Sequence, residues 1–327
     1  MSVQTLIVAT DEVDIRLDRW FRRHLPQVSH GLLEKLLRSG QIRVDGKRAK
    51  SSQRLAPGQQ VRVPPLPDAP PAAGERPPAQ VSDADARALQ DAVLYRDDHV
   101  IALNKPPGLA VQGGTGTERH LDAMLDALRY DGERPRLVHR LDKDTSGVLL
   151  LGRTAAAAAK LAAAFRSRQA RKLYWALVVG VPKLRQGRVD APLAKLPGRM
   201  GDKVAVDEDE GKRAVTWYRV VDSVVRRAAW LELMPTTGRT HQLRAHCGLI
   251  GTPIVGDGKY GGAEAFLSGQ GVSRKLHLHA RAIEMPHPLA GTLRVVAPLP
   301  THITASFDFF GFDEKQAGQP FAAFVVE

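Results

Sequence analysis

The chain carries the sequence Val-His-Arg-Leu-Asp-Lys-Asp-Thr-Ser-Gly at residues 138–147, and three leucines follow at residues 149–151. The leucines predict a short buried strand. Charged side chains directly beside a core strand are costly unless they are paired or have a function. One interpretation is a surface turn, because Asp, Thr, Ser and Gly are common turn residues. The other is a carboxylate held at the end of a sheet, oriented by Arg140 and by nearby hydroxyl and backbone donors.

The composition favours a polyanionic partner. The chain has 327 residues, a net charge of +12 and a pI near 10.0. Such an excess of positive charge favours nucleic acid ahead of a membrane surface. No apolar run approaches the length of a membrane span, and the apolar stretch at residues 6–9 is too short for a signal peptide. A single cysteine, Cys247, fits a reducing compartment, so we expect a cytoplasmic protein.

Residues 1–64 are expected to form a small domain with its own core. Apolar residues at helical spacing predict a helix that ends at Pro26 and a second helix that is capped by Ser29. A turn at Asp45-Gly46 and short strands follow. This segment contains 12 Lys and Arg against 6 Asp and Glu, which predicts a phosphate-binding surface with salt-sensitive affinity. The basic residues assigned to that surface are Arg22, Arg23, Lys35, Arg38, Arg43, Lys47, Arg48 and Lys50.

Residues 65–86 are rich in proline, which neither continues a helix nor donates to a sheet, and are therefore predicted to be a linker. Residues 87–327 form the second expected domain. Its patterns predict a buried strand near residues 100–103, an alanine-rich helix at residues 154–168 capped by its first residue, and several further strands. Strands outnumber helices and do not alternate with them regularly, which favours an α+β fold with a mixed sheet over a doubly wound fold.

Three polar clusters lie beside predicted strands of this domain, at residues 140–146, 171–174 and 236–246. The chain has no Walker loop and no dinucleotide fingerprint. A metal site at His241 and His246 is disfavoured, because side chains five residues apart on a helix diverge. What remains is an aspartate with arginine partners and a nearby tyrosine. Such a set can supply a nucleophile or a base without a cofactor.

The motifs resemble those of a known family, the RNA pseudouridine synthases of the ribosomal large subunit group. His139-Arg140-Leu141-Asp142 with Thr145-Ser146-Gly147 matches the signature of that family. Further segments resemble its other motifs in the same order, and residues 1–64 resemble the S4 RNA-binding module that often precedes the catalytic domain. The chain is most similar to large subunit synthase C, with synthase D second. The further motifs are at residues 104–108, 171–174, 237–246 and 253–257.

The resemblance implies an isomerase that converts specific uridines to pseudouridine, in 23S ribosomal RNA at synthase C-like sites. It implies a mixed, mainly antiparallel central sheet flanked by helices, preceded by a small α+β S4-like domain that binds RNA. No cofactor and no metal are expected, and a monomer is expected. Since a uridine inside a base stack cannot be reached, the base must be flipped out.

The resemblance also implies roles for single residues. Asp142 is the essential carboxylate, and whether it attacks the sugar, attacks the base or acts as a base stays open. Tyr174 stacks on the target base and can move a proton, and Arg244 pairs with Asp142. The residues implied to bind the substrate are Arg140, His139, Thr145, Arg239, His241, Lys172 and Lys105.

Other functions fit parts of the sequence. Within the family, a synthase D-like or a tRNA-directed enzyme is the alternative. A non-catalytic RNA-binding or ribosome-assembly protein would explain the basic first domain equally well, but it has little use for a carboxylate beside phosphate. An aspartyl-nucleophile hydrolase or phosphotransferase is weakly suggested by residues 142–145, although the chain lacks a phosphate loop.

Overall fold

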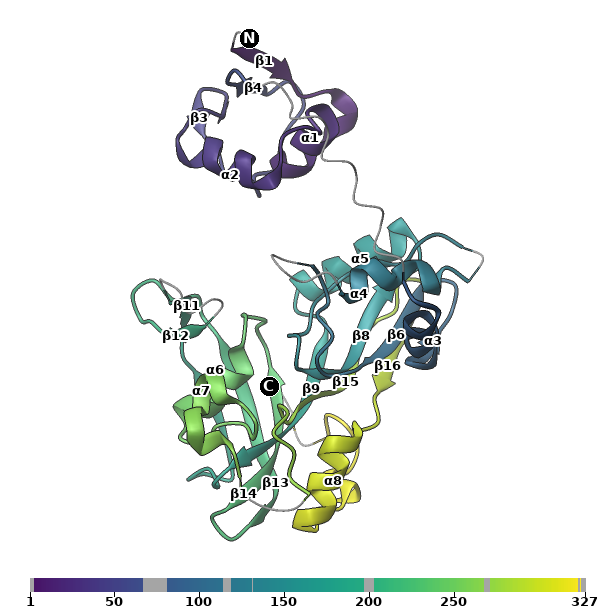
Figure 1. The fold of residues 1–327 in the computed structure, drawn as a ribbon, viewed down its shortest axis with the longest axis vertical. Helices are drawn as coiled ribbons and strands as arrows, with labels where there is room; N and C mark the ends of the chain where they lie inside the picture. Colours follow the sequence, from purple (N-terminus) through teal and green to yellow (C-terminus); the bar gives the residue numbers. More distant parts are fainter. Residues whose placement is uncertain are drawn as a thin grey trace. The chain divides into compact units, whose positions relative to one another are not determined.

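The computed structural model describes residues 3–66, 81–113, 119–130, 132–196, 203–267, 271–322 and 324. The chain divides into two compact units, Met1–Pro78 and Ala79–Glu327 (Figure 1). Most of the predicted linker, residues 67–80, lies outside the described residues. The last residues of the predicted linker differ from the prediction, because they already belong to helix α3 (Asp83–Asp91). The hydroxyl of Ser82 accepts the N–H of Asp85 and so caps this helix.

The first unit combines two helices with a four-stranded antiparallel sheet around one apolar core. Its elements are β1 (Gln4–Ile7), η1 (Thr10–Glu12), α1 (Leu17–His24), α2 (His30–Arg38), β2 (Arg43–Val44), β3 (Lys47–Arg48) and β4 (Gln60–Val63). The strand order is β1-β4-β2-β3. The predicted cap at Ser29 is confirmed, since its hydroxyl accepts the N–H of Leu32 at 3.3 Å. Asp45 and Gly46 both have positive φ, as the predicted turn requires.

The second unit is built on one large sheet with the strand order β10-β13-β14-β9-β15-β8-β6-β5. Strand β16 pairs with β15 and β7 with β8. The paired strands of this sheet are antiparallel except for β15 and β8, which run parallel, so the predicted mixed, mainly antiparallel sheet is confirmed. The strands are β5 (Val93–Arg96), β6 (Val100–Lys105), β7 (Arg136–Leu137), β8 (Ser146–Gly152), β9 (Arg171–Val179), β10 (Gln186–Asp190), β13 (Val215–Val224), β14 (Ala228–Pro235), β15 (Leu278–Pro286) and β16 (Thr292–Val296).

Helices cover both faces of this sheet (Figure 1). In β8 the leucines at positions 149 and 151 face α4 (Leu121–Met124) and η2 (Leu125–Leu128), whereas Val148 and Leu150 face α5 (Ala155–Arg166). Around β9, β13 and β14, α6 (Gln242–Leu249) packs on one face and α8 (Thr301–Phe310) on the other. No described helix combines the length and apolar character that crossing a membrane requires. The remaining elements are β11 (Leu193–Lys195), β12 (Val204–Val206), α7 (Gly258–Gly261), η3 (Gly262–Ala265) and η4 (Glu314–Ala317).

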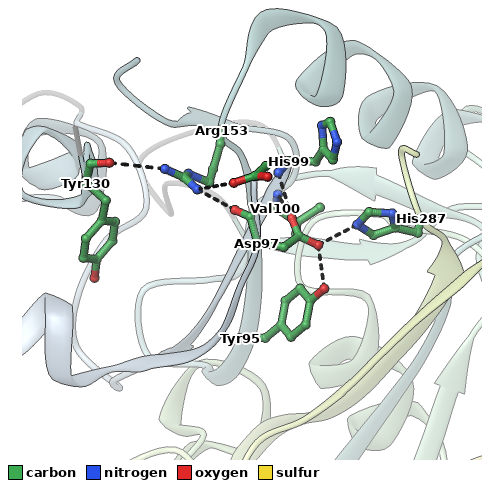
Figure 2. Close-up of polar contacts among 8 residues, drawn as sticks. Tyr95, Asp97, His99, Val100, Tyr130, Arg153 and His287 are labelled. Carbon is green, nitrogen blue, oxygen red and sulfur yellow. Dashed lines mark hydrogen bonds and ion pairs between the residues drawn. The ribbon is translucent and has the colours of Figure 1, made fainter. Parts of the chain in front are cut away.

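A carboxylate joins two turns of the sheet that are distant in sequence (Figure 2). Oδ1 of Asp97 accepts the backbone N–H groups of His99 and Val100, each at 2.7 Å. Oδ2 accepts the hydroxyl of Tyr95 at 2.5 Å and Nε2–H of His287 at 2.8 Å. Oδ1 therefore closes the β5–β6 turn and Oδ2 holds this turn to the β15–β16 hairpin, so we assign this cluster a structural role.

Candidate active site

Asp142 lies in the loop between β7 and β8, beside the only described parallel strand pair of the sheet. The N–H of Thr145 closes a turn on the carbonyl of Asp142 at 3.2 Å. Gly147, which follows, has φ of 108°, and a Cβ there would lie 2.2 Å from the carbonyl oxygen of Ala280 in β15. Only glycine fits this close approach. Residues 142–145 therefore form a tight turn, which presents Asp142 just before the start of the core strand β8.

Lys105 braces this loop from inside the protein. Its side chain is 1% exposed, and Nζ donates to the carbonyls of Pro106 at 2.7 Å, Leu109 at 2.9 Å and Lys143 at 3.0 Å. Burial lowers the pKa of Lys105 to about 7. The expected contact of Lys105 with the substrate does not fit this geometry, because all three N–H groups of the ammonium form already have partners.

A pocket of about 820 Å³ opens beside Asp142. Its walls come from the loop before β8, the start of β9, the loop at residues 235–241 and helix α6. It brings together the residues that the sequence predicted for the site, apart from Lys105. Those that line it are Asp142, Tyr174, Arg244, His139, Arg140, Thr145, Lys172, Arg239 and His241.

Tyr174 and Lys172 line the pocket from alternate positions of β9. Tyr174 packs against the two hydrophobic clusters that meet here. Its burial, together with the charge of Asp142, raises the pKa of its hydroxyl, so Tyr174 is a neutral phenol near pH 7. Nζ of Lys172 lies 3.4 Å from the carbonyl of Thr237, and burial lowers the pKa of this amine to about 8.

Arg244 forms its ion pair with Asp257, which corrects the expectation that it pairs with Asp142. Nε and Nη2 of Arg244 donate to the two oxygens of Asp257, each at 2.7 Å. The same carboxylate accepts the N–H of Tyr260 at 3.2 Å and so caps α7. Although burial lowers the pKa of the Arg244 guanidinium, the hydrogen bonds and charge of Asp257 outweigh it and raise the pKa, and the charge of Asp142 adds to that rise. Asp257 lies in one of the segments that resemble family motifs, residues 253–257, but its partner was not predicted.

His241 faces the proposed catalytic carboxylate, with Nε2 lying 3.9 Å from Oδ2 of Asp142. It occupies the N-cap of α6 with a left-handed backbone, φ of 52°. The side chain of His241 makes no capping hydrogen bond. Gln242 holds the loop instead, because its Oε1 accepts the hydroxyl of Thr237 at 2.7 Å and the N–H of Arg239 at 3.1 Å.

His139 forms a wall of the pocket. Its ring stacks on Phe165 with centroids 4.4 Å apart, and its Nε2 accepts the N–H of Leu150 at 2.9 Å. Burial, with the nearby charge of Lys172, lowers the pKa of His139 to about 3, so the ring is neutral. Phe165 was not predicted, because nothing in its helical context indicates that it stacks on a histidine 26 residues earlier.

The remaining predicted residues lie on or under the rim. Arg140 and Arg239 are exposed at the pocket, and Nε of Arg239 donates to the carbonyl of Arg213 at 3.0 Å. Thr145 is buried.

The pocket thus offers a carboxylate, a neutral phenol and several cations around one concavity, a combination that suits a flat, polar and anionic ligand. Within the described residues, no three His, Cys, Asp or Glu side chains cluster as a metal site would require.

The basic residues predicted in the first unit lie on α1, α2, β2 and β3 or beside them. Seven of the eight are exposed, and Arg43 is half-buried because it donates to the carbonyls of Gly40 at 3.2 Å and Gly46 at 3.0 Å. An exposed basic surface of this kind can contact a phosphate backbone.

Comparison with known proteins agrees with this arrangement. Residues 99–248 match the family model described as RNA pseudouridylate synthase, and residues 15–61 match the S4 domain. Ribosomal large subunit pseudouridine synthase C of Rickettsia typhi is 35% identical, over 91% of this chain and 98% of its own. The enzyme of the same name from Salmonella typhi is 38% identical, over 91% of this chain and 93% of its own.

A solved structure shows the same fold. Human RNA pseudouridylate synthase domain containing 4 superposes with a TM-score of 0.59 and 31% sequence identity, covering 69% of this chain and 95% of that chain. The two predictions drawn from the motifs, a pseudouridine synthase and an S4 domain, are therefore confirmed. This chain belongs to the RNA pseudouridylate synthase family and is an RNA pseudouridine synthase, an isomerase, with an S4 domain near its N-terminus.

Proposed function

We propose that this enzyme isomerises specific uridines of 23S ribosomal RNA, with Asp142 as its essential carboxylate. The target is supported by the names of the relatives, which act on the ribosomal large subunit. The observation that carries the proposed role of Asp142 is its place in a pocket of about 820 Å³ that it shares with Tyr174 and Arg244. This volume lies within the range of small-molecule sites, about 300–1,000 Å³, and so accommodates one nucleotide.

The uridine enters this pocket by leaving its base stack. Unstacking costs a few kcal/mol, and basic side chains that contact the RNA backbone can offset that cost. Arg140 and Arg239 at the rim are placed to hold phosphates on either side of the target. Lys172, deeper in the pocket, has an amine whose pKa is about 8, so it is largely cationic near pH 7.

The reaction breaks the bond from N1 of uracil to C1′ of the ribose, turns the base and forms a bond from C5 to C1′. The proton of C5 is lost and N1 gains a proton, so the product is an isomer and needs no oxidant or energy source. Asp142 is the group placed to act on the sugar or the base. Tyr174 supplies a flat face for the uracil and a phenol that can move a proton.

Arg244 is proposed to stabilise negative charge at the carboxylate and at the uracil. Because Asp257 holds two of its donors at 2.7 Å, its position is fixed before substrate binds. Such preorganised charge is more effective than a flexible side chain.

The proposal is tested with Asp142→Asn. We expect the variant to bind RNA and to form no pseudouridine, measured on 23S ribosomal RNA from a strain that lacks the gene. Mapping the uridines that wild type modifies in that RNA identifies the sites. Product formed by the variant at near the wild-type rate would contradict the role of Asp142. Modification of transfer RNA alone would contradict the target.

A further inference from the structure

A chain of polar contacts runs from the β11–β12 hairpin to Asp142 through two side chains. The N–H of Val204 lies 3.0 Å from the hydroxyl oxygen of Tyr260, and that oxygen lies 3.0 Å from Nδ1 of His241. On the other side of the imidazole, Nε2 lies 3.9 Å from Oδ2 of Asp142. Tyr260 therefore stands directly behind the ring that faces Asp142.

The directions of these hydrogen bonds follow from the donors and acceptors that are available to each group. A backbone N–H can only donate, so the oxygen of Tyr260 accepts from Val204. Among the described residues, Nδ1 of His241 is the one acceptor within hydrogen-bond distance of the Tyr260 hydroxyl, so its single proton is directed at Nδ1. In the neutral imidazole one nitrogen accepts and the other carries the proton. Nδ1 is the acceptor, and Nε2 therefore presents an N–H to Asp142.

The ring of Tyr260 is itself fixed by several neighbours. Its backbone N–H donates to Asp257 at 3.2 Å, and the guanidinium carbon of Arg244 lies 5.1 Å from the ring centroid. The ring also meets His241 edge-on, at 82° and a centroid distance of 5.7 Å. A residue that contacts both His241 and Arg244 is well placed to set the orientation of the groups around the pocket.

His241 is held in an uncommon conformation. Its φ of 52° lies in the left-handed region, which a non-glycine residue adopts only where its surroundings compensate. The charged groups that act on its ring are Asp142, Arg244, Lys259 and Asp257. Two are positive and two are negative, so charge alone does not fix the ring, and the hydroxyl of Tyr260 supplies the directional contact.

We propose that Tyr260 is a positioning residue that acts through His241. It accepts from the hairpin, donates to Nδ1, and so keeps the Nε2–H of His241 directed at Asp142 and at a uridine bound there. This inference rests on the proposed function, in which Asp142 is the essential carboxylate. The distance of 3.9 Å is longer than a hydrogen bond, and contacts of this kind shorten when substrate binds.

The tautomer is tested first, on the wild-type protein. Nitrogen NMR of protein labelled with [¹⁵N]histidine distinguishes a protonated ring nitrogen from an unprotonated one, and the His241→Gln spectrum identifies the signals of His241. We expect an unprotonated Nδ1 and a protonated Nε2. A proton on Nδ1 of the neutral ring would overturn the proposal, and this readout does not depend on activity.

The second test is a cycle of variants. The amide nitrogen of glutamine reaches the place of Nε2, whereas that of asparagine reaches only the place of Nδ1. We therefore expect His241→Gln to keep more activity than His241→Asn. Tyr260→Phe should lower kcat about 5- to 10-fold, because this change in rate corresponds to the free energy of about one hydrogen bond. KM should change by less than about twofold.

The cycle distinguishes positioning from packing. In the His241→Gln background no Nδ1 remains for the hydroxyl to fix, so adding Tyr260→Phe should lower kcat less than about twofold. An undiminished loss in that background would overturn the proposal, because Tyr260 would then act only on the local fold. An active Asp142→Asn enzyme would instead refute the proposed function, so the two failures are distinguishable.

Discussion

Arg244 and Asp257 are joined by two hydrogen bonds of 2.7 Å, and their side chains are only 10% and 0% exposed. The pair lies beside Asp142 but does not include it. One carboxylate, Asp257, therefore holds the arginine in place, and the other faces the pocket with His241 as its near neighbour. Dividing these tasks leaves Asp142 available to a ligand.

The ion pair predicts a large effect of Asp257→Asn. Breaking a buried pair leaves a buried guanidinium without its counter-charge, at a cost of about 3–5 kcal/mol. We expect the free energy of unfolding, measured with urea, to fall by about 3 kcal/mol or more, and activity to be lost. Asp144→Asn, on an exposed side chain of the active-site loop, is the matched control and should change stability by less than about 0.5 kcal/mol. Equal stability of the two variants would contradict this account.

Features that depend on neighbours in sequence were predicted well. The caps at Ser29 and Thr154 and the buried strand after the active-site loop are present. Each depends on residues within a few positions, where hydrophobic periodicity and capping preferences are informative.

Partners chosen by tertiary structure could not be predicted in the same way. Arg244 has two aspartates nearby, and opposite charge alone does not decide between Asp142 and Asp257. Lys105 was expected to bind the substrate because residues 104–108 resemble a motif of the family. It turns inward because three carbonyl groups, one of them 38 residues away, converge on its Nζ. Sequence patterns do not encode such convergence.

Tyr174 is predicted to separate stacking from proton transfer. Tyr174→Phe keeps the flat ring, so RNA affinity should stay within about twofold of the wild-type value. Any loss of catalytic rate in this variant is then due to the missing hydroxyl group. Tyr174→Ala removes the stacking surface, worth about 1–3 kcal/mol per base, and should weaken binding at least about fivefold. Equilibrium binding of the target RNA fragment measures both, with the thermal stability of each variant as the control. Equal affinities for the two variants would argue against stacking.

The basic surface of the first unit should determine the salt dependence of RNA binding. Lys35, Arg38 and Lys47 are exposed on α2 and β3. Replacing all three with glutamine should lower the slope of log K against log salt by about 2, since each contact with a single strand contributes about 0.7. Lys315→Gln, an exposed change in the second unit, is the control. An unchanged slope in the triple variant would show that these three residues do not contact phosphate.

The cluster around Asp97 predicts a stability change in acid (Figure 2). Although burial raises the pKa of this carboxyl, hydrogen bonds from Tyr95, His99, Val100 and His287 outweigh it and lower the pKa to about 2. The folded-state pKa lies below the unfolded value of about 3.9. The contribution of the Asp97 carboxylate to the free energy of unfolding is therefore complete above about pH 4 and is lost as the pH falls towards 2. Its size is about 2 kcal/mol, from 1.36 kcal/mol per pKa unit.

Asp97→Asn should therefore lower the free energy of unfolding by about 2 kcal/mol at pH 6. The difference from wild type should shrink as the pH is lowered from about 4 to about 2, because the wild-type carboxyl is then protonated. Urea unfolding at a series of pH values measures this difference directly. Asp98→Asn is the matched control, since the neighbouring side chain is 98% exposed. A difference between Asp97→Asn and wild type that stays constant with pH would mean that the hydrogen bonds do not favour the charged carboxylate.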